Sequence, residues 1–214
     1  FMGTVDFGGG PIASISGADV FVAKCSPAGD HLWSRHIQSG TGASGLGRGI
    51  AVDASGNVVV TGAFGGTADF GAGPVTSPQG WAIFVTKYSA SGTALWSKST
   101  GGWLSDSGNA VAVDAAGNVV VTGQFGHMLN FGTGWLDSHG TDIFLAKFTP
   151  SGTPVWVKAL GGTWDELPYG IAVDTGGNVV ITGTFAGGTN LGGGPLLANA
   201  AASSDIFVAK YSPA

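Results

Sequence analysis

The sequence repeats itself with a period of about 60 residues. The segment at 49–64, Gly-Ile-Ala-Val-Asp-Ala-Ser-Gly-Asn-Val-Val-Val-Thr-Gly-Ala-Phe, returns with few changes at 110–125 and again at 170–185. A period of this length, made of β-branched residues between glycines, indicates that similar structural units are stacked along the chain.

Each repeat carries four strand-like segments. In the copy with the fewest changes they cover residues 50–53, 57–62, 83–87 and 94–98. Val, Ile, Phe and Trp dominate these segments, and Gly, Ser, Asn or Asp bound them. Short turns that contain Gly56 or Gly92 join the first to the second and the third to the fourth. The pattern therefore predicts two hairpins in each unit, forming a four-stranded antiparallel sheet.

The second and third strands of each unit do not alternate apolar with polar residues. The runs at 58–60 and 142–146 are apolar at almost every position. Such strands need to be covered on both faces, whereas a sandwich of two sheets leaves one face in water and shows alternation. Sheets that stack face to face around an axis satisfy this requirement, so the chain is expected to be all-β and to form a β-propeller.

The same segments resemble a known family. The succession Ala-Val-Asp-Ala-x-Gly-Asn-Val-Val-Val-Thr-Gly, Asp-Ile-Phe-Val-Ala-Lys-Tyr-Ser and Leu-Trp-Ser-Lys is similar to the bacterial seven-bladed β-propeller repeat family, known as SBBP, and more loosely to NHL-type propeller repeats. The resemblance covers nearly the whole chain. It implies a propeller that is often secreted or held on the bacterial cell surface, and it implies no particular activity.

Counting the copies gives about 3.5 blades in one propeller segment, 1–214. The predicted division is a partial blade at 1–48 with the third and fourth strands, blades at 49–109 and 110–169, and a partial blade at 170–214 with the first three strands. Closed propellers typically need about 4–8 blades, and open sheet edges favour association. We therefore expect a homo-oligomer, or further blades of a longer chain, to complete the ring.

Composition excludes several classes of partner. The net charge is −5, and the eight Lys and Arg residues form no cluster, which argues against nucleic acid as a partner. No apolar run approaches the roughly 20 residues of a membrane span, so no membrane insertion is expected. Cys25 is the single cysteine and cannot form a disulfide within the chain.

Residues that break the repeat are candidates for function, because a repeated framework separates architecture from site. In a blade whose strands run up and down, the connections after the second and the fourth strand share one face, and most of the non-repeated aromatic and charged residues lie in them. Long loops on a rigid framework are where binding residues usually lie. The candidate ligand-binding residues are Arg48, Trp81, Trp103, Asp106, Trp135, Trp164, Asp165, Glu166 and Tyr169.

These residues suit binding better than catalysis. Trp, Tyr and Arg are favoured anchors for a protein partner, and an indole beside a carboxylate suits a sugar. The alternative is that the tryptophans pack against loops.

The sequence contains none of the common catalytic motifs, and we expect no enzyme activity, no metal and no cofactor. A calcium site at the Asp-x-x-Gly-Asn turn, such as 53–57, is disfavoured because it offers one carboxylate where calcium wants 6–8 oxygen ligands. The leading hypothesis is a non-enzymatic extracellular or cell-surface scaffold for protein interaction or assembly; the alternative is a carbohydrate-binding lectin.

Overall fold

The computed structural model describes residues 1–15, 17–40, 43–101, 103–199 and 204–213, and these residues form strands and connections without a helix. Their strands are β1 Thr4–Asp6, β2 Pro11–Ala13, β3 Val20–Cys25, β4 His31–Ser39, β5 Ser44–Val52, β6 Val58–Asp69, β7 Pro74–Tyr88, β8 Ala94–Gly101, β9 Ser107–Val113, β10 Val119–Leu129, β11 Leu136–Phe148, β12 Pro154–Gly162, β13 Glu166–Val173, β14 Val179–Ala186, β15 Gly188–Asn190, β16 Pro195–Leu197 and β17 Ser204–Tyr211.

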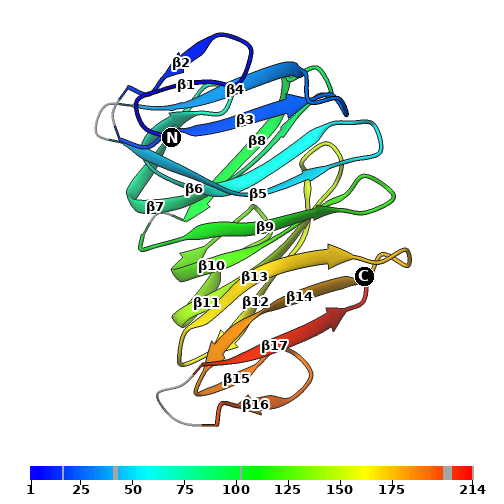
Figure 1. Cartoon of the computed structure of the whole chain (residues 1–214). Coiled ribbons are helices and arrows are strands. Elements are labelled where there is room, and N and C mark those ends of the chain that lie inside the picture. Colours follow the sequence, from blue (N-terminus) through cyan, green and yellow to red (C-terminus); the bar gives the residue numbers. More distant parts are fainter. Residues whose placement is uncertain (16, 41–42, 102, 200–203, 214) are drawn as a thin grey trace.

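The strands form four sheet units stacked in sequence order. Unit 2 consists of β5, β6, β7 and β8, and unit 3 of β9, β10, β11 and β12, each antiparallel and paired in chain order. Unit 1 has the pair β3 and β4, and unit 4 has β13, β14 and β17. The units follow one another from the N-terminal to the C-terminal end of the stack (Figure 1). The all-β prediction and the two antiparallel hairpins of each complete unit are confirmed.

Three apolar cores fill the spaces between consecutive units. Phe84 of unit 2 packs with Val22 of unit 1, and Ile83 of unit 2 packs in the next core with Phe144 of unit 3. The third core joins units 3 and 4. Because Phe84 and Ile83 are neighbours on β7 and both are buried, that strand is covered on both faces, as its apolar run predicted.

The turn between the first two strands of a unit is held by its aspartate. Asp53 accepts hydrogen bonds from the N–H groups of Ser55 and Asn57, each 2.9 Å long, and Gly56 has a φ of 76°. The copies at Asp114 and Asp174 make the same bonds. These contacts confirm that the turn needs a glycine in the left-handed region and a side chain that bonds the backbone.

The connections between the second and third strands are not the long loops that the sequence predicted. β6 and β7 continue past the core as a narrow tip hairpin, 67–76, which is repeated by β1 with β2, at 128–137, and by β15 with β16. Its end pairs with the last strand of the preceding unit, where Gln38 lies opposite Asp69. The tip hairpin therefore fastens neighbouring units at their outer edge.

Two side chains shape each tip hairpin. In unit 2, Asp69 Oδ1 accepts hydrogen bonds from Gly71 N at 2.7 Å and Gly73 N at 3.1 Å. The next residue, Phe70, is buried and stacks on Phe84 with ring centroids 4.7 Å apart. Equivalent carboxylate or amide turns begin at Asp6, Asn130 and Asn190. The tip hairpin is therefore a further repeated element, and its sequence sign is an Asp or Asn followed by an apolar residue and a glycine.

Candidate functional site

The first strands of units 2, 3 and 4 lie side by side along one edge of the stack (Figure 1). Each carries a β-bulge at the same repeat position, where the register with the second strand shifts by one residue. The residues at the bulges are Arg48, Asn109 and Tyr169. A bulge redirects a side chain out of the regular alternation, so this position is suited to presenting one residue from each unit.

A glycine on the second strand makes room for each bulge. A β-carbon on Gly62, Gly123 or Gly183 would clash with a carbonyl oxygen of the neighbouring first strand. The Thr-Gly pair in every repeat is thus explained in part by backbone contact, because any larger residue would push the two strands apart. The repeated frame fixes the position of the bulge and leaves the residue on it free to vary.

The three bulge residues differ in their contacts. The Tyr169 side chain is exposed, and its hydroxyl accepts a hydrogen bond from Thr184 Oγ1 at 3.3 Å. Asn109 Nδ2 donates to the carbonyl of Pro168 at 2.9 Å, which ties unit 3 to unit 4. Arg48 is exposed. The sequence assigned Arg48 and Tyr169 to connections between units, whereas both belong to strands.

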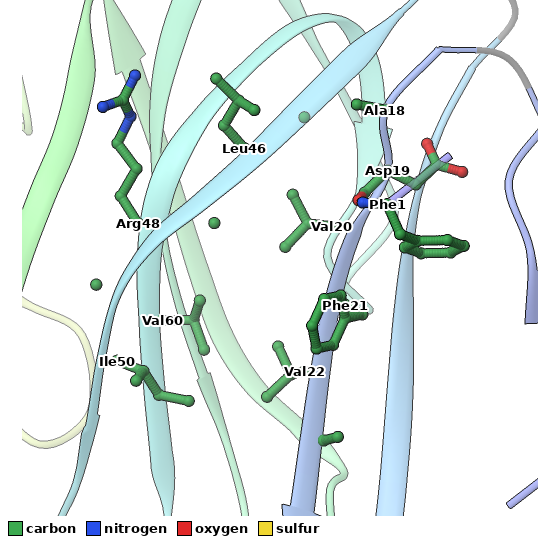
Figure 2. A pocket seen from close by; sticks show the side chains of 14 residues that line it. Phe1, Ala18, Asp19, Val20, Phe21, Val22, Leu46, Arg48, Ile50 and Val60 are labelled. Atoms are coloured by element: carbon green, nitrogen blue, oxygen red, sulfur yellow. The ribbon is translucent and has the colours of Figure 1, made fainter. Parts of the chain in front are cut away.

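A cavity of about 360 Å³ lies beside Arg48, between β3 and β5. Figure 2 shows that Val20, Val22, Leu46 and Val60 line it, and that the Arg48 guanidinium points away from Val20 and Val22. The cavity lies along the edge of β3 that pairs with no described strand, whereas the equivalent β7 and β11 each have a second strand on that edge. The cavity is therefore an apolar space in the seam, or contact region, between units 1 and 2, and no described strand covers it on that edge.

A second hollow, of about 310 Å³, lies between the tryptophans Trp103 and Trp135. Trp103 stacks on His127 with ring centroids 6.1 Å apart. Among the described residues, His127 is the one non-glycine residue with a positive φ, at 77°, and its N–H donates to Ser138 Oγ at 2.6 Å. The same repeat position is occupied by Gly3, Gly66 and Gly187, each with a positive φ, so this backbone conformation belongs to the bulge at the base of the tip hairpin. The two tryptophans, 45% and 65% exposed, thus lie at an open polar and aromatic surface.

The remaining predicted tryptophans lie elsewhere. Trp164 is 51% exposed and packs over Gly187 at the junction of units 3 and 4. Trp81 is half-buried within β7, where its backbone N–H donates to the carbonyl of Leu104 at 2.9 Å. The sequence had placed Trp81 in a loop, and the longer β7 explains the difference.

The predicted carboxylates are divided between surface and interior. Asp106 is fully buried and accepts a hydrogen bond from Gly126 N at 2.9 Å, and Glu166 is also fully buried. Asp165 is exposed and accepts from Thr141 N at 3.2 Å. Asp106 and Glu166 therefore lie in the seams between units, beyond the reach of a ligand on the surface.

The opposite face holds the repeated turns. Trp33 Nε1 donates to the carbonyl of Ala90 at 2.9 Å, and Trp96 Nε1 donates to that of Pro150 at 3.0 Å, so each indole bonds a turn of the next unit. The turn aspartates are neutralised there by lysine, with Lys87 Nζ 2.9 Å from Asp53 Oδ2. These contacts argue against calcium at the turns, because the carboxylate already has a cation.

The described residues contain no group of three or more His, Cys, Asp and Glu side chains arranged to hold a metal ion. Cys25 is exposed and unpaired. A search of the described part of the chain for a helix that could cross a membrane found none.

Comparisons with known proteins found distant relatives. No family model matches the chain. It is 26% identical over 163 residues to an uncharacterized WD repeat-containing protein of Acanthamoeba polyphaga mimivirus, covering 64% of this chain and 11% of that protein. It is 29% identical over 194 residues to the regulatory protein FlaEY of Caulobacter vibrioides, covering 87% of this chain and 20% of that protein. A Bacteroides caccae protein of unknown function aligns with a TM-score of 0.30 and 11% identity, covering 85% of this chain and 74% of that one. The chain thus spans a fifth or less of the length of these curated relatives.

Proposed function

We propose that the chain is an arc of a β-propeller that serves as a non-enzymatic scaffold for protein interaction. Three observations support the propeller: complete units have four antiparallel strands, consecutive units bury both faces of the central strands, and the first strands line one edge of the stack. The similarity to a WD repeat-containing protein agrees with a repeat of this kind. The bacterial seven-bladed repeat family and a cell-surface or extracellular location remain parts of this proposal.

One observation carries the interaction function. The repeated aromatic residues at the centre of the units, such as Phe84 and Phe144, are fully buried, while Trp103, Trp135 and Tyr169, which break the repeat, are 45–65% exposed. Burial of a large aromatic contributes about 1.5–3 kcal/mol, so exposed aromatics on a rigid frame are available to a partner. Trp103, which follows the fourth strand of unit 2, lies against His127 near the end of β10, the second strand of unit 3, so these two residues meet on one surface.

The partner that fits this surface is an extended or loop segment of another protein. The hollow between Trp103 and Trp135 is lined by Thr76, Ser99 and other neutral residues, and its lining contains no described carboxylate. Indoles and hydroxyls suit peptide side chains and backbone groups. A sugar site would gain from a carboxylate beside the indole, and two of the acids considered for that role, Asp106 and Glu166, are buried.

A peptide-display selection tests the proposal. The purified chain is used to select binders from a random peptide library, and a glycan array is probed in parallel. We expect selected peptides whose affinity falls at least tenfold in Trp135→Ala and Trp103→Ala. Leu95→Ala is the control, because Leu95 is 52% exposed on β8 and lies outside the hollow.

Two results would contradict the proposal. Enriched peptides that bind equally well to the tryptophan variants and to Leu95→Ala would place the interaction elsewhere. Binding to one class of glycan that is lost in the tryptophan variants, without peptide selection, would support the lectin alternative instead. Circular dichroism of each variant shows that any loss of binding occurs in a folded protein.

We extend the proposal to assembly through the two end faces of the stack. Ile206 and Val208 of unit 4 are 84% and 75% exposed, while the residues at the same repeat position in unit 3, Ile143 and Leu145, are fully buried against the next unit. At the other end, Phe21 is 43% exposed, whereas Phe84 is fully buried. Each end therefore presents apolar side chains that are covered wherever a neighbouring unit is present.

A further inference from the structure

Two acidic side chains meet in the seam between units 3 and 4. Asp142 comes from β11 and Glu166 is the first residue of β13, and their exposed fractions are 6% and 0%. A β-carbon on Gly161 of β12 would lie 2.6 Å from Glu166 Oε2 and 2.8 Å from Asp142 Oδ1. Both carboxylates therefore lie against Gly161, and a side chain at residue 161 would collide with them.

Oxygen atoms of this cluster lack hydrogen-bond partners. Glu166 Oε2 accepts from Gly162 N at 3.1 Å, but Glu166 Oε1 and Asp142 Oδ1 have no partner among the described residues. Thr189 of β15 is buried beside the Glu166 carboxylate, and its hydroxyl acts on that carboxylate as a hydrogen-bond donor. Buried polar atoms are rarely left without partners, so the two carboxylate oxygens indicate a ligand or a proton at this place.

The groups around Asp142 and Glu166 do not neutralise the negative charge of the two carboxylates. Burial, together with the negative charges of Asp142 and Asp165, raises the pKa of Glu166 to about 7, against the opposing hydrogen bonds from Gly162 and Thr189. Burial raises the pKa of Asp142 to about 6, and the charge of His139 offsets this only in part. Two negative charges in a closed site are costly unless a cation or protons neutralise them.

The other seams each hold one acid at these two repeat positions. Between units 1 and 2, Asp19 lies 2.7 Å from His36 Nε2, and the position of Glu166 is taken by Gly45. Between units 2 and 3, Asp106 accepts from Gly126 N, and the position of Asp142 is taken by Ala82. The seam between units 3 and 4 differs from both because it has an acid at each position.

We propose that this seam binds a divalent cation, and that the cation is calcium. Asp142, Glu166 and the Thr189 hydroxyl supply oxygen ligands, and backbone carbonyls or water would complete the 6–8 that calcium takes. Magnesium fits less well because it gives up its water reluctantly and demands regular octahedral geometry, and zinc prefers nitrogen and sulfur. The three side chains come from β11, β13 and β15, so the ion would join unit 3 to unit 4.

Isothermal titration and thermal unfolding with calcium chloride test this site. The full chain is freed of metal with a chelator and studied at pH 8. We expect one site per chain with a Kd on the order of 10⁻⁴ M. At 10 mM calcium, about 100-fold above that Kd, the Tm should rise by about 5–10 °C, and 10 mM magnesium should give a much smaller rise.

Matched variants identify the ligands. Glu166→Gln and Asp142→Asn should each weaken calcium binding at least tenfold and remove most of the calcium-dependent rise in Tm. Asp205→Asn is the control, because Asp205 occupies the repeat position of Asp142 at the open end of the stack, and its variant should bind like the wild type. If Glu166→Gln does not fold, Asp142→Asn and the wild-type titration decide the question.

Three outcomes would overturn the proposal. The first is the absence of saturable calcium binding up to 10 mM. The second is binding that survives both Glu166→Gln and Asp142→Asn. The third is a gain in Tm of both variants in the chelator with no calcium effect on the wild type, which would show that the acids share protons instead of a metal. None of these measurements depends on the partner surface at Trp103 and Trp135.

Discussion

At the scale of single residues, one repeated ion pair occurs in three environments. Lys87 with Asp53 and Lys147 with Asp114 are almost fully buried, with N–O distances of 2.9 and 3.3 Å. Lys210 with Asp174, at 2.8 Å, is largely exposed. Breaking a buried pair leaves an uncompensated charge in the interior, whereas an exposed pair contributes little because water and salt screen it. The repeat thus offers an internal comparison in which sequence is nearly constant and burial varies.

The substitution Lys87→Met should therefore cost much more than Lys210→Met. We expect Lys87→Met to lower the free energy of unfolding by roughly 3–5 kcal/mol, because Asp53 remains buried without its cation. Lys210→Met should change stability by little more than the error of measurement. Urea unfolding followed by tryptophan fluorescence measures both, and equal losses in the two variants would contradict this account.

The same aspartates predict how acid destabilises the protein. Burial acts to raise the pKa of Asp53, but hydrogen bonds from Asn57 and Lys87 outweigh it and lower the pKa to about 2. The pKa of Asp114 is also lowered. A carboxyl whose pKa is lower in the folded state than its unfolded value of about 3.9 stabilises the fold above that pH.

Stability from these turns should accordingly fall as the pH drops from about 4 toward 2. Urea unfolding at a series of pH values measures the slope. Asp53→Asn should show a smaller loss over this range than the wild type, because the titrating group is gone. An unchanged slope in Asp53→Asn would show that other carboxyls govern acid unfolding.

At the scale of strands and hairpins, the sequence predicts what repeats with a plain hydrophobic or turn pattern. The two hairpins of each unit, the turn aspartate and the central phenylalanine follow from such patterns. The tip hairpin was missed although Asp69-Phe70-Gly71 and its copies mark it four times, because its glycines look like a loop until the carboxylate turn is seen. The bulges were missed because register is set by contact between strands, which leaves only a Thr-Gly pair as its sign.

The same limit applies to the candidate site. Exposure of Trp103 and Trp135 agrees with their place outside the repeat pattern, because nothing in the repeated core requires them. Burial of Asp106 and Glu166 could not be predicted from their type or their position near a loop. It follows from the close approach of neighbouring first strands, which is a property of the stack and not of any one segment.

The bulge glycine gives a prediction at this scale. Gly123→Ala should destabilise the protein by about 1–3 kcal/mol or more, because its β-carbon would clash with the Ser107 carbonyl and with Phe144. Gly193→Ala is the control, since its β-carbon would meet no atom within 4 Å and its φ is not positive. Thermal unfolding by circular dichroism compares the two, and equal Tm values would refute the explanation of the Thr-Gly pair.

At the scale of the whole molecule, the two end faces of the stack present different apolar side chains. Inside the stack, Ile83 and Val85 of one unit pack against Phe144 of the next. The C-terminal face presents Ile206 and Val208, and the N-terminal face presents Phe21, which are the same two halves of that contact. A contact between unlike faces is a head-to-tail contact, and it produces a ring if the rotation closes and a filament if it does not.

Self-association of this chain should therefore depend on both faces. We expect sedimentation velocity to show a concentration-dependent dimer or larger species, because about 3.5 units cannot close a ring alone and paired end faces would bury the exposed apolar residues. Ile206→Glu with Val208→Glu should shift the chain to monomer, and Phe21→Glu should do the same from the other side. The control is Leu95→Glu, because Leu95 is 52% exposed on β8 of unit 2, which lies between two other units and at neither end face. A wild-type chain that stays monomeric at about 100 µM, or association unaffected by both sets of changes, would contradict the head-to-tail contact and leave the end faces to other partners.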